Sequence, residues 1–433
     1  MERHRKQLAS TLVLASALIA GIATFLLPLS LQAQTQAQPK GIDPDLMARA
    51  NAGDKNAQWL VAYAYEKGEG VPQDFAKAVA WYRKAAEQNY ADAQTQLGTL
   101  YKDGHGVKQS GAQAAAWYRK AANQGDAFAQ ELLGGLYQFG DSGVPQDYAI
   151  AEGWYRKAAE PGRLNSPWPK GQPIAQFSIG EYYQFGGRSV TQDFAQAAAW
   201  YRKAADQGFA PAQFDLGVLY ENGQGLPQDY AQAAEWYRKA AEQGDANAQF
   251  NLGGLYLKGY GLPQDYAQAV AWFRKAADQG DATAQYDLGI FYFRGQGVPQ
   301  DYAQAAEFYR KAAEQGHAGA QFSLGQLYYN GLGVKQDYAQ SVSWLRKAAE
   351  QGDASAQYNV GVLYFSGKGA PQSYSEAYFW LDLAAARSPI PDGPGQGDVV
   401  KARDAAAARL TPEDLSKVQE RAAKWFEEHP ARP

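Results

Sequence analysis

The sequence predicts an all-α fold, a solenoid in which about nine pairs of helices stack on one another and a C-terminal helix closes the end. An aromatic block, Trp-Tyr-Arg-Lys-Ala-Ala, returns along the chain at a nearly constant interval of 36 residues. Between successive blocks lie two amphipathic segments separated by Gly-rich turns. A fixed interval of this size is typical of stacked supersecondary units that share one continuous core. A hydrophobic content of 46% is enough to form such a core.

The repeats occupy residues 54–387. The aromatic block or a variant of it begins at Trp81, Trp117, Trp154, Trp200, Trp236, Trp272, Phe308, Trp344 and Trp380. The successive intervals are 36, 37, 46 and then 36 throughout. The long interval predicts an insertion at 161–172, and one extra residue stands in the turns of the third and fourth repeats. We therefore expect the solenoid to bend or change its twist at this point.

The sixth repeat shows why each unit is a helix pair. Asp245 is a cap for a first helix that ends at Gly259, and apolar residues follow at helical spacing: Ala248, Leu252, Leu255 and Tyr256. Asp265 stands three residues before Gln268, a capping-box spacing, and opens a second helix that ends at Gly280. On this helix we expect one face to carry Ala267, Ala271, Trp272 and Ala276. Small residues such as Gly253 and Ala267 would let the two helices approach closely.

The two ends of the chain differ from the repeats. Arg3, Arg5 and Lys6 precede an uncharged apolar run at 8–31, which predicts a secretory signal peptide over 1–33. The run is also long enough to be an uncleaved membrane anchor, although Pro28 would break its helix. Residues 34–53 are interpreted as a linker and the N-terminal start of the fold. Residues 388–433 are interpreted as a linker and C-terminal capping helices, the last of which opens at Thr411.

Composition and motifs argue against several functions. The 41 basic and 45 acidic residues give a net charge of −4 with both signs mixed along the repeats, so nucleic-acid binding is not expected. Cysteine is absent, which excludes disulfides and thiolate chemistry. The four histidines, His4, His105, His317 and His429, are scattered, and no phosphate-binding loop occurs. We expect no catalytic residue, no metal and no cofactor.

The repeat pattern resembles a known family. The residues from Ala212 to Ala241 read Ala-Gln-x-x-Leu-Gly-x-Leu-Tyr, then Gly-x-Gly and Gln-Asp-Tyr, then Trp-Tyr-Arg-Lys-Ala-Ala. This pattern is similar to the Sel-one-like repeat (SLR) family, which is related to the tetratricopeptide repeats. The resemblance implies a right-handed α-α superhelix that acts as an adaptor or assembly scaffold, often in the bacterial cell envelope. Some cysteine-rich members are linked to β-lactam hydrolysis, but their cysteines are missing here, and no serine stands three residues before a lysine.

Candidate binding residues lie where the repeats differ. The eighth position after the recurrent Gln of the first helix is polar in five repeats and apolar in the last four: Leu257, Phe293, Tyr329 and Phe365. Equivalent positions line up along a solenoid, so these four form an apolar stripe that would suit a protein partner. Packing of the stripe against a neighbouring helix is the alternative, and it is favoured.

Two further aromatic features have two interpretations each. Directly after the Gln, repeats four to nine carry Phe177, Phe214, Phe250, Tyr286, Phe322 and Tyr358. Core packing explains this column better than a ladder for stacking sugars. Trp168, between two prolines of the insertion, is held in an extended segment. It would either dock on a partner or fold onto its own solenoid.

These observations favour an exported, non-enzymatic scaffold that binds proteins in the cell envelope, periplasmic or secreted. An inner-membrane-anchored form facing the periplasm is the alternative if the N-terminal segment is not cleaved, and this segment is the only expected membrane contact. A solenoid that binds peptidoglycan or another polysaccharide is the second hypothesis for function. A hydrolase of the β-lactamase-like type is a distant third.

Overall fold

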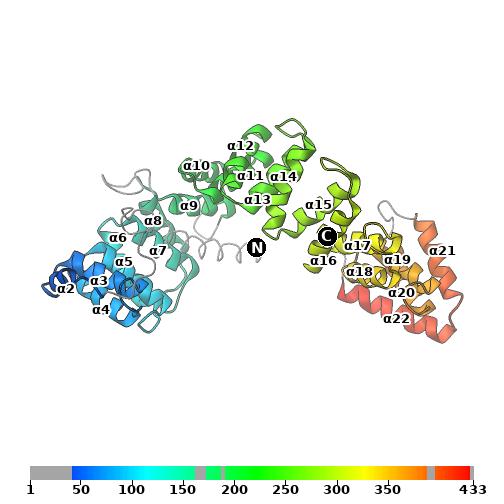
Figure 1. Cartoon of the computed structure of the whole chain (residues 1–433), viewed down its shortest axis with the longest axis horizontal. Helices are drawn as coiled ribbons and strands as arrows, with labels where there is room; N and C mark the ends of the chain where they lie inside the picture. The colour runs from blue at the N-terminus through cyan, green and yellow to red at the C-terminus, as the bar shows by residue number, and fades with distance from the viewer. Residues whose placement is uncertain (1–40, 161–171, 187–190, 388–394, 430–433) are drawn as a thin grey trace. The chain divides into compact units, whose positions relative to one another are not determined.

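The recurring caps and apolar positions produce a chain of short antiparallel helices. The computed structural model describes residues 41–160, 172–186, 191–387 and 395–429. These residues form the helices α2 to α22 and one isolated β-bridge between Asp141 and Val144 (Figure 1). The chain divides into two compact units after Ala158, at the end of α8 and directly before the predicted insertion. Each unit is described by itself.

Unit 1 contains three repeats behind a short first helix. Its helices are α2 (Pro44–Asn51), α3 (Lys55–Lys67), α4 (Phe75–Glu87), α5 (Ala91–Asp103), α6 (Gly111–Asn123), α7 (Ala127–Phe139) and α8 (Tyr148–Ala159). The first member of each pair is called helix A and the second helix B. Repeat 1 is thus α3 and α4, repeat 2 is α5 and α6, and repeat 3 is α7 and α8.

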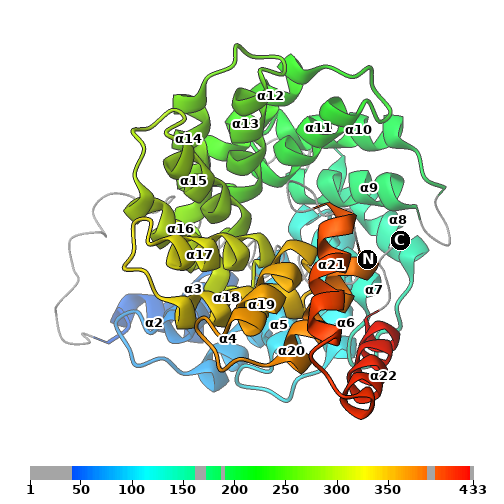
Figure 2. The same cartoon turned by 90° about the vertical axis from the view of Figure 1, so that its right-hand side faces the viewer.

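Unit 2 contains six repeats and two terminal helices. Repeats 4 to 6 are α9 (Pro173–Phe185), α10 (Phe194–Ala205), α11 (Ala210–Asn222), α12 (Tyr230–Glu242), α13 (Ala246–Lys258) and α14 (Tyr266–Asp278). Repeats 7 to 9 are α15 (Ala282–Arg294), α16 (Tyr302–Glu314), α17 (Ala318–Asn330), α18 (Tyr338–Glu350), α19 (Ala354–Ser366) and α20 (Tyr374–Ala386). They are followed by α21 (Gln396–Ala407) and α22 (Pro412–Glu428). Within this unit the pairs follow one another in a curved row (Figure 2).

The predicted caps fix the helix ends. In repeat 6, the Asp245 carboxylate accepts a hydrogen bond from the Ala248 amide at 2.8 Å, and Asp265 accepts from the Ala267 and Gln268 amides. Gly259 ends α13 with φ of 72°, a left-handed conformation that costs glycine least. Because only a few residues separate helix A from helix B, the two must pack antiparallel.

The core runs continuously from one repeat to the next. A typical buried cluster contains Ala240 and Tyr237 of α12 together with Leu252 and Leu255 of α13 and Trp272 of α14. Helix B of each repeat therefore shares its apolar side with helix A of the next. Successive hairpins bury a common interior, as the repeat pattern predicts.

The buried face of helix B differs from the predicted one. In α14, Ala267 and Ala271 are exposed, whereas the buried residues are Ala269, Val270, Trp272, Phe273, Ala276 and Ala277. The prediction was correct for Trp272 and Ala276 and wrong for the other two. The residue after the tryptophan is the central one: a Cβ on Gly253 would lie 3.1 Å from the Phe273 ring, so the glycine admits this ring between the two helices.

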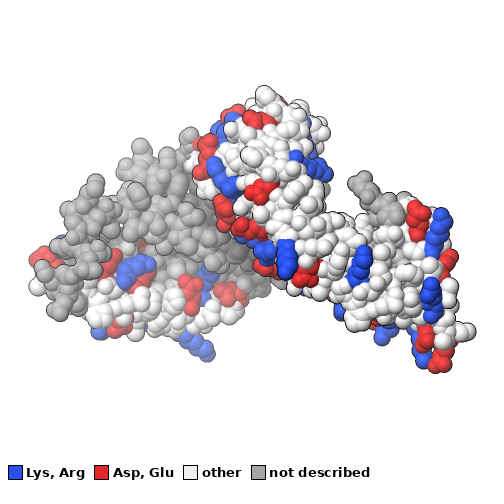
Figure 3. Space-filling model, turned by 45° about the vertical axis from the view of Figure 1, so that its right-hand side comes forward, with Lys and Arg blue, Asp and Glu red and all other residues white. Residues whose placement is uncertain are grey.

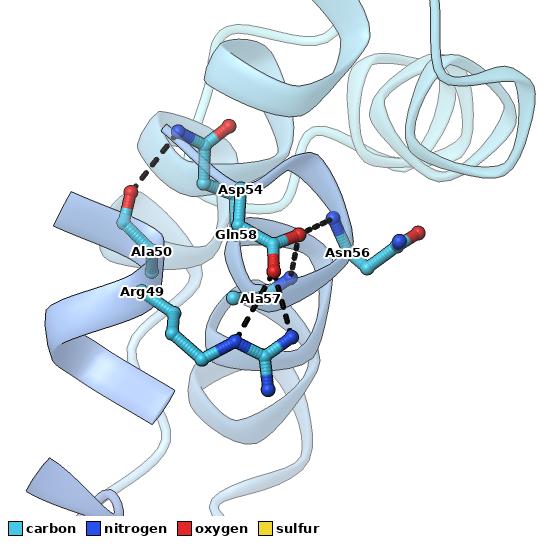
Figure 4. A network of polar contacts seen from close by, with 6 residues as sticks. All are labelled: Arg49, Ala50, Asp54, Asn56, Ala57 and Gln58. Atoms are coloured by element: carbon cyan, nitrogen blue, oxygen red, sulfur yellow. Dashed lines mark hydrogen bonds and ion pairs between the residues drawn. The ribbon is translucent and has the colours of Figure 1, made fainter. Parts of the chain in front are cut away.

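The segment expected as a linker before the repeats contains α2, which acts as a half-repeat. The side-chain amide of Gln58 donates to the Ala50 carbonyl at 3.1 Å, as the equivalent Gln of later repeats does to a preceding helix B. Arg49 pairs with Asp54, which also caps α3 through the Asn56 and Ala57 amides (Figure 4). Asp43 and Pro44, a cap followed by proline at the first helical position, are the sequence signal for α2.

The C-terminal end is closed by two helices. α21 and α22 both pack on α20, and Val418 and Ala422 of α22 are buried in the last core cluster. The Thr411 hydroxyl caps α22 at the Asp414 amide, as the sequence predicts. The helix α21 begins at Gln396, within the segment that had been expected as a linker.

Two predicted features fall outside the described residues. The signal peptide or anchor lies in residues 1–40, and the insertion with Trp168 lies in residues 161–171. In the part of the chain that is described, no helix combines the length and the apolar character needed to cross a membrane. The extra residue of repeat 3 is visible, because Gly140 ends α7 with ψ of 156° instead of the left-handed value found at Gly259.

Candidate functional site

A buried glutamine joins three helices in each repeat. In repeat 6, the amide of Gln249 donates to the Ala241 carbonyl of the preceding helix B at 3.0 Å. Its side-chain oxygen accepts from Gln279, at the end of α14, at 2.9 Å. The same glutamine pair occurs in repeats 1, 2, 4, 5, 7 and 8. The recurrent Gln is therefore a structural bridge between neighbouring repeats.

The bridge is incomplete in repeat 9. Arg387 stands where the other repeats have the second glutamine, and its guanidinium donates to the Gly352 carbonyl at 2.7 Å. The same group lies 4.9 Å from the centroid of the Trp425 ring in the terminal helix. Gln357 still donates to the Ala349 carbonyl, but its buried side-chain oxygen has no hydrogen-bond partner. The substitution thus marks the change from repeat to cap.

The Arg-Lys pairs of helix B also connect repeats. The arginine donates to the hydroxyl of a tyrosine in the next helix A, as Arg238 does to Tyr256 at 3.1 Å. The lysine that follows lies over the tryptophan of its own helix, with Lys239 3.9 Å from the Trp236 centroid. The interpretation of these pairs as structural side chains agrees with these contacts.

The predicted apolar stripe is a row of aromatic pairs within single repeats. Phe293 packs edge-on against Tyr302, the first residue of helix B, with centroids 5.3 Å apart. The pairs Tyr329–Tyr338 and Phe365–Tyr374 have the same geometry. Leu257 lies partly buried in the cluster that contains Tyr266. Phe293 is the most open member at 36% exposure, so the stripe packs internally and shows its outer edges to solvent.

The polar members of the same column bond to a buried tyrosine. The Glu66 carboxylate accepts from the Tyr82 hydroxyl at 2.8 Å, and Glu221 accepts from Tyr237 at 2.6 Å. Gln138 and Gln184 accept in the same way from helix B of repeats 3 and 4. In repeat 6, Leu257 faces a helix B that carries Phe273 at the tyrosine position. The change from polar to apolar therefore accompanies loss of the hydroxyl in repeats 6, 8 and 9.

The second aromatic column packs on helix B. Phe177 lies 5.4 Å from Tyr201, Phe214 lies 5.8 Å from Tyr237, and Phe250 lies 5.3 Å from Phe273, measured between ring centroids. In repeat 3 the same position holds Glu131, which is 5% exposed and has one carboxylate oxygen without a partner. Burial raises the pKa of Glu131 to about 8.

Three acidic side chains on helix A of unit 2 were missed by the sequence reasoning. Glu181, Asp215 and Asp287 are partly buried and sit two or five residues after the recurrent Gln. Burial, together with the neighbouring Asp245, raises the pKa of Asp215 to about 7. Burial and the charge of Asp281 raise the pKa of Asp287 to about 6. Burial and the charge of Asp215 likewise hold the pKa of Glu181 well above its usual range.

Charge is unevenly divided between the two helix layers of unit 2. The helix A members contain two basic residues, Lys258 and Arg294, each the last residue of its helix. Every helix B from α10 to α18 carries an Arg-Lys pair instead. The visible face of the unit shows both signs interspersed (Figure 3). Tracing charge along each helix layer separately, rather than along the whole chain, could have found the acids from the sequence.

The described histidines have structural contacts. His105 stacks on Phe75, and His429 stacks on Trp425. The Nδ1 atom of His317 accepts a hydrogen bond from the Ala320 amide at 3.2 Å and so replaces the usual Asp at the start of α17. Within the described ranges, no group of three or more histidine, aspartate or glutamate side chains is placed to hold a metal ion.

A hollow of about 500 Å³ lies where α22 meets the last repeats. Phe379, Trp380 and Trp425 contribute aromatic surface to it. Its charged lining is already paired: Arg346 with Glu350, Arg421 with Glu376, and Lys424 with Glu428. Because the three cations and three anions offset one another, the hollow has no net charge preference for a ligand.

Comparison with known proteins agrees with the repeat architecture. The Sel1 repeat model matches residues 55–90, 91–126, 127–162, 173–209, 210–245, 246–281, 282–317, 318–353, 354–389 and 405–428. A solved structure of c5321, a protective antigen of uropathogenic Escherichia coli with an SLR fold, is 32% identical and has a TM-score of 0.50. The match covers 89% of this chain and 94% of that one. No curated protein matches the chain.

A second solved structure, a Sel1 repeat protein from Oxalobacter formigenes, is also 32% identical, with a TM-score of 0.58. The match covers 78% of this chain and 98% of that one. The fold and these matches define a solenoid of helix-pair repeats, and the chain belongs to the Sel1 repeat family. The match at 405–428 includes most of α22, so the terminal cap is itself related to the repeats.

Proposed function

We propose that this protein is an exported, non-enzymatic scaffold that binds other proteins in the bacterial cell envelope. The observation that carries the proposal is the architecture itself, since Sel1 repeat solenoids are typically protein-interaction scaffolds. A stack of hairpins offers a long surface whose side chains vary from repeat to repeat while the interior bridges stay constant. Such a surface suits macromolecular partners better than small substrates.

Export is supported by the N-terminal sequence, in which basic residues precede a long apolar run. The description of the Escherichia coli relative as a protective antigen suits a protein reached by antibodies outside the cytoplasm. An alkaline phosphatase fusion after Lys40 would be active in the bacterial periplasm if the segment directs export. Inactivity of this fusion, with activity of a control carrying a known signal peptide, would contradict export.

The binding function is tested by chemical crosslinking of the full chain in its native host, followed by affinity recovery under denaturing conditions. We expect a small, reproducible set of crosslinked proteins at near-physiological expression. Recovery of the uncrosslinked chain alone would contradict a protein-binding scaffold. Turnover of a β-lactam or a glycan by the purified protein, absent from a heat-inactivated control, would contradict its non-enzymatic character.

Polysaccharide binding is the second candidate. It is favoured by the repeated aromatic pairs of unit 2, whose outer edges recur once per repeat at Phe293, Tyr329 and Phe365. Retention of the purified protein on protein-free peptidoglycan sacculi would support this function. Elution at the position of a non-binding control would remove it.

A further inference from the structure

The helix A layer of unit 2 presents a face that no other element of the unit covers. We call it the helix A face and define it by six residues at the second and fifth positions after the recurrent Gln: Glu181, Asp215, Val218, Asp287, Ile290 and Val362. These positions are three residues apart and so lie side by side on a helix. Val362 is 36% exposed, and a Cβ added to Gly254, also at a fifth position, would meet no atom within 4 Å. The face therefore has room for a partner.

Acidic groups on this face lack compensating cations. Asp215 acts on Glu181, Asp245 acts on Asp215, and Asp281 acts on Asp287, each raising the pKa of the other carboxyl. No hydrogen bond of the described residues satisfies the side chains of Glu181, Asp215 or Asp287. A partly buried carboxylate surrounded by like charge costs free energy unless a cation joins it.

The helix B layer is the internal comparison. Its acids are paired with lysines one turn away, as Glu235 is with Lys239 at 2.9 Å and Glu307 with Lys311 at 2.8 Å. Side-chain hydrogen bonding and the charge of Lys311 keep the pKa of Glu307 below its usual range. The same protein thus neutralises acids on one layer and leaves them uncompensated on the other.

We propose that the helix A face of unit 2 is the docking surface for an extended segment of a partner protein that alternates basic and apolar side chains. The proposal rests on the scaffold function and specifies its partner. Lysine or arginine side chains of the segment supply the positive charge that the acids of this face lack. The apolar side chains between them cover Val218, Ile290 and Val362, and complementarity of charge selects this class of partner over acidic ones.

The test measures binding of two labelled peptides by fluorescence anisotropy. One is built of Lys-Leu-Gly triplets, and the other is the same peptide with Glu for Lys. The protein is used as the full mature chain in three forms. The first is the wild type, and the second carries Glu181→Gln, Asp215→Asn and Asp287→Asn. The third carries Glu235→Gln, Glu307→Gln and Glu314→Gln, which remove three exposed acids from helix B.

We expect the wild type to bind the lysine peptide at least about tenfold more tightly than the glutamate peptide. The helix A variant should lose about tenfold or more of this affinity, and the helix B variant should stay within about twofold. Because the three helix A substitutions remove repulsion, this variant should melt no lower than the wild type. Equal binding of the two peptides, no binding of either, or equal loss in both variants would overturn the proposal.

Failure here is separable from failure of the scaffold function. If the helix A variant still crosslinks to the same proteins in cells as the wild type, the scaffold function stands and this surface is wrong. If the wild type crosslinks to nothing in cells while the peptide results hold, the surface binds basic segments but the scaffold function fails.

Discussion

The side-chain amide of Gln279 donates to the side-chain oxygen of Gln249, 2.9 Å away, and through this bond the end of one helix pair is joined to its own first helix. Gln249 in turn holds the Ala241 carbonyl of the preceding repeat. One buried residue thus satisfies groups on two neighbouring repeats. Since the pair recurs along the chain, it contributes to the spacing of the whole stack.

Replacing Gln249 with Ala should reduce the free energy of unfolding by about 1 to 3 kcal/mol, because the Gln279 amide and the Ala241 carbonyl both lose their partner. Urea unfolding followed by tryptophan fluorescence measures the change. Gln268→Ala, at an exposed position of α14, is the control and should have an effect within about 0.5 kcal/mol. Equal effects of the two substitutions would show that the bridge is not stabilising.

The Tyr237–Glu221 pair should be exchangeable with the apolar pair of repeat 6. Tyr237→Phe leaves the Glu221 carboxylate without its donor, and Glu221→Leu leaves the buried hydroxyl without this acceptor. Each change should cost about 1 kcal/mol or more. The double variant, which reproduces Phe273 and Leu257, should cost less than the sum of the two. Strict additivity in the double-mutant cycle would contradict the coupling.

Glu131 should make the stability of unit 1 depend on pH. An unfolded glutamate titrates near 4.5, and burial raises the folded pKa to about 8. The folded state therefore holds the proton more tightly, so stability is highest below the unfolded pKa and falls as pH rises toward the folded one. The loss approaches about 1.4 kcal/mol per pH unit at most in this window.

Urea midpoints of the wild type and Glu131→Gln, measured at several values from pH 5 to pH 9, check this prediction. The variant should be the more stable protein above pH 8 and should lack most of the pH dependence. Glu87→Gln, at an exposed position of α4, is the control and should follow the wild type. A wild-type midpoint that does not change between pH 5 and pH 9 would contradict the assignment.

His317 should cap α17 only in its neutral form, because Nδ1 must accept the hydrogen bond from the Ala320 amide. Burial lowers the pKa of His317 below its usual 6.5, although Asp281 opposes the shift. The stabilising neutral form is favoured above the unfolded pKa, and its contribution is lost as pH falls through the folded pKa. A titration of the imidazole proton signals by NMR should therefore place His317 below 6.5, and a value above 7 would contradict the capping role.

The sequence predicted the architecture because caps and glycines act locally. Asp245 and Gly259 begin and end α13 as expected, since each satisfies backbone groups of its own helix. It was less informative about which of two adjacent aromatic residues faces inward. Tyr237 is fully buried beside Trp236 because it occupies the space left by Gly217, a contact between two helices that spacing within one helix does not reveal.

The candidate surfaces were predicted only in part for the same reason. The column from Leu257 to Phe365 was found because its members change from polar to apolar along the chain. The meaning of its polar members depends on bonds to helix B, such as Glu221 to Tyr237, which lie 16 residues away in the sequence. The acids at Asp215 and Asp287 were missed because basic residues of helix B balance them in the total charge, although they lie on another layer.

The most direct measurement of the central claim is site-specific photo-crosslinking in living cells. A photoreactive amino acid is placed at Val362 on the helix A face and, in a second strain, at Glu307 on the exposed side of helix B. The account predicts a discrete protein adduct from position 362 that is absent or much weaker from position 307. Absence of any protein adduct from position 362, with the crosslinker shown to be incorporated and the chain folded, would contradict a scaffold that binds proteins through this face.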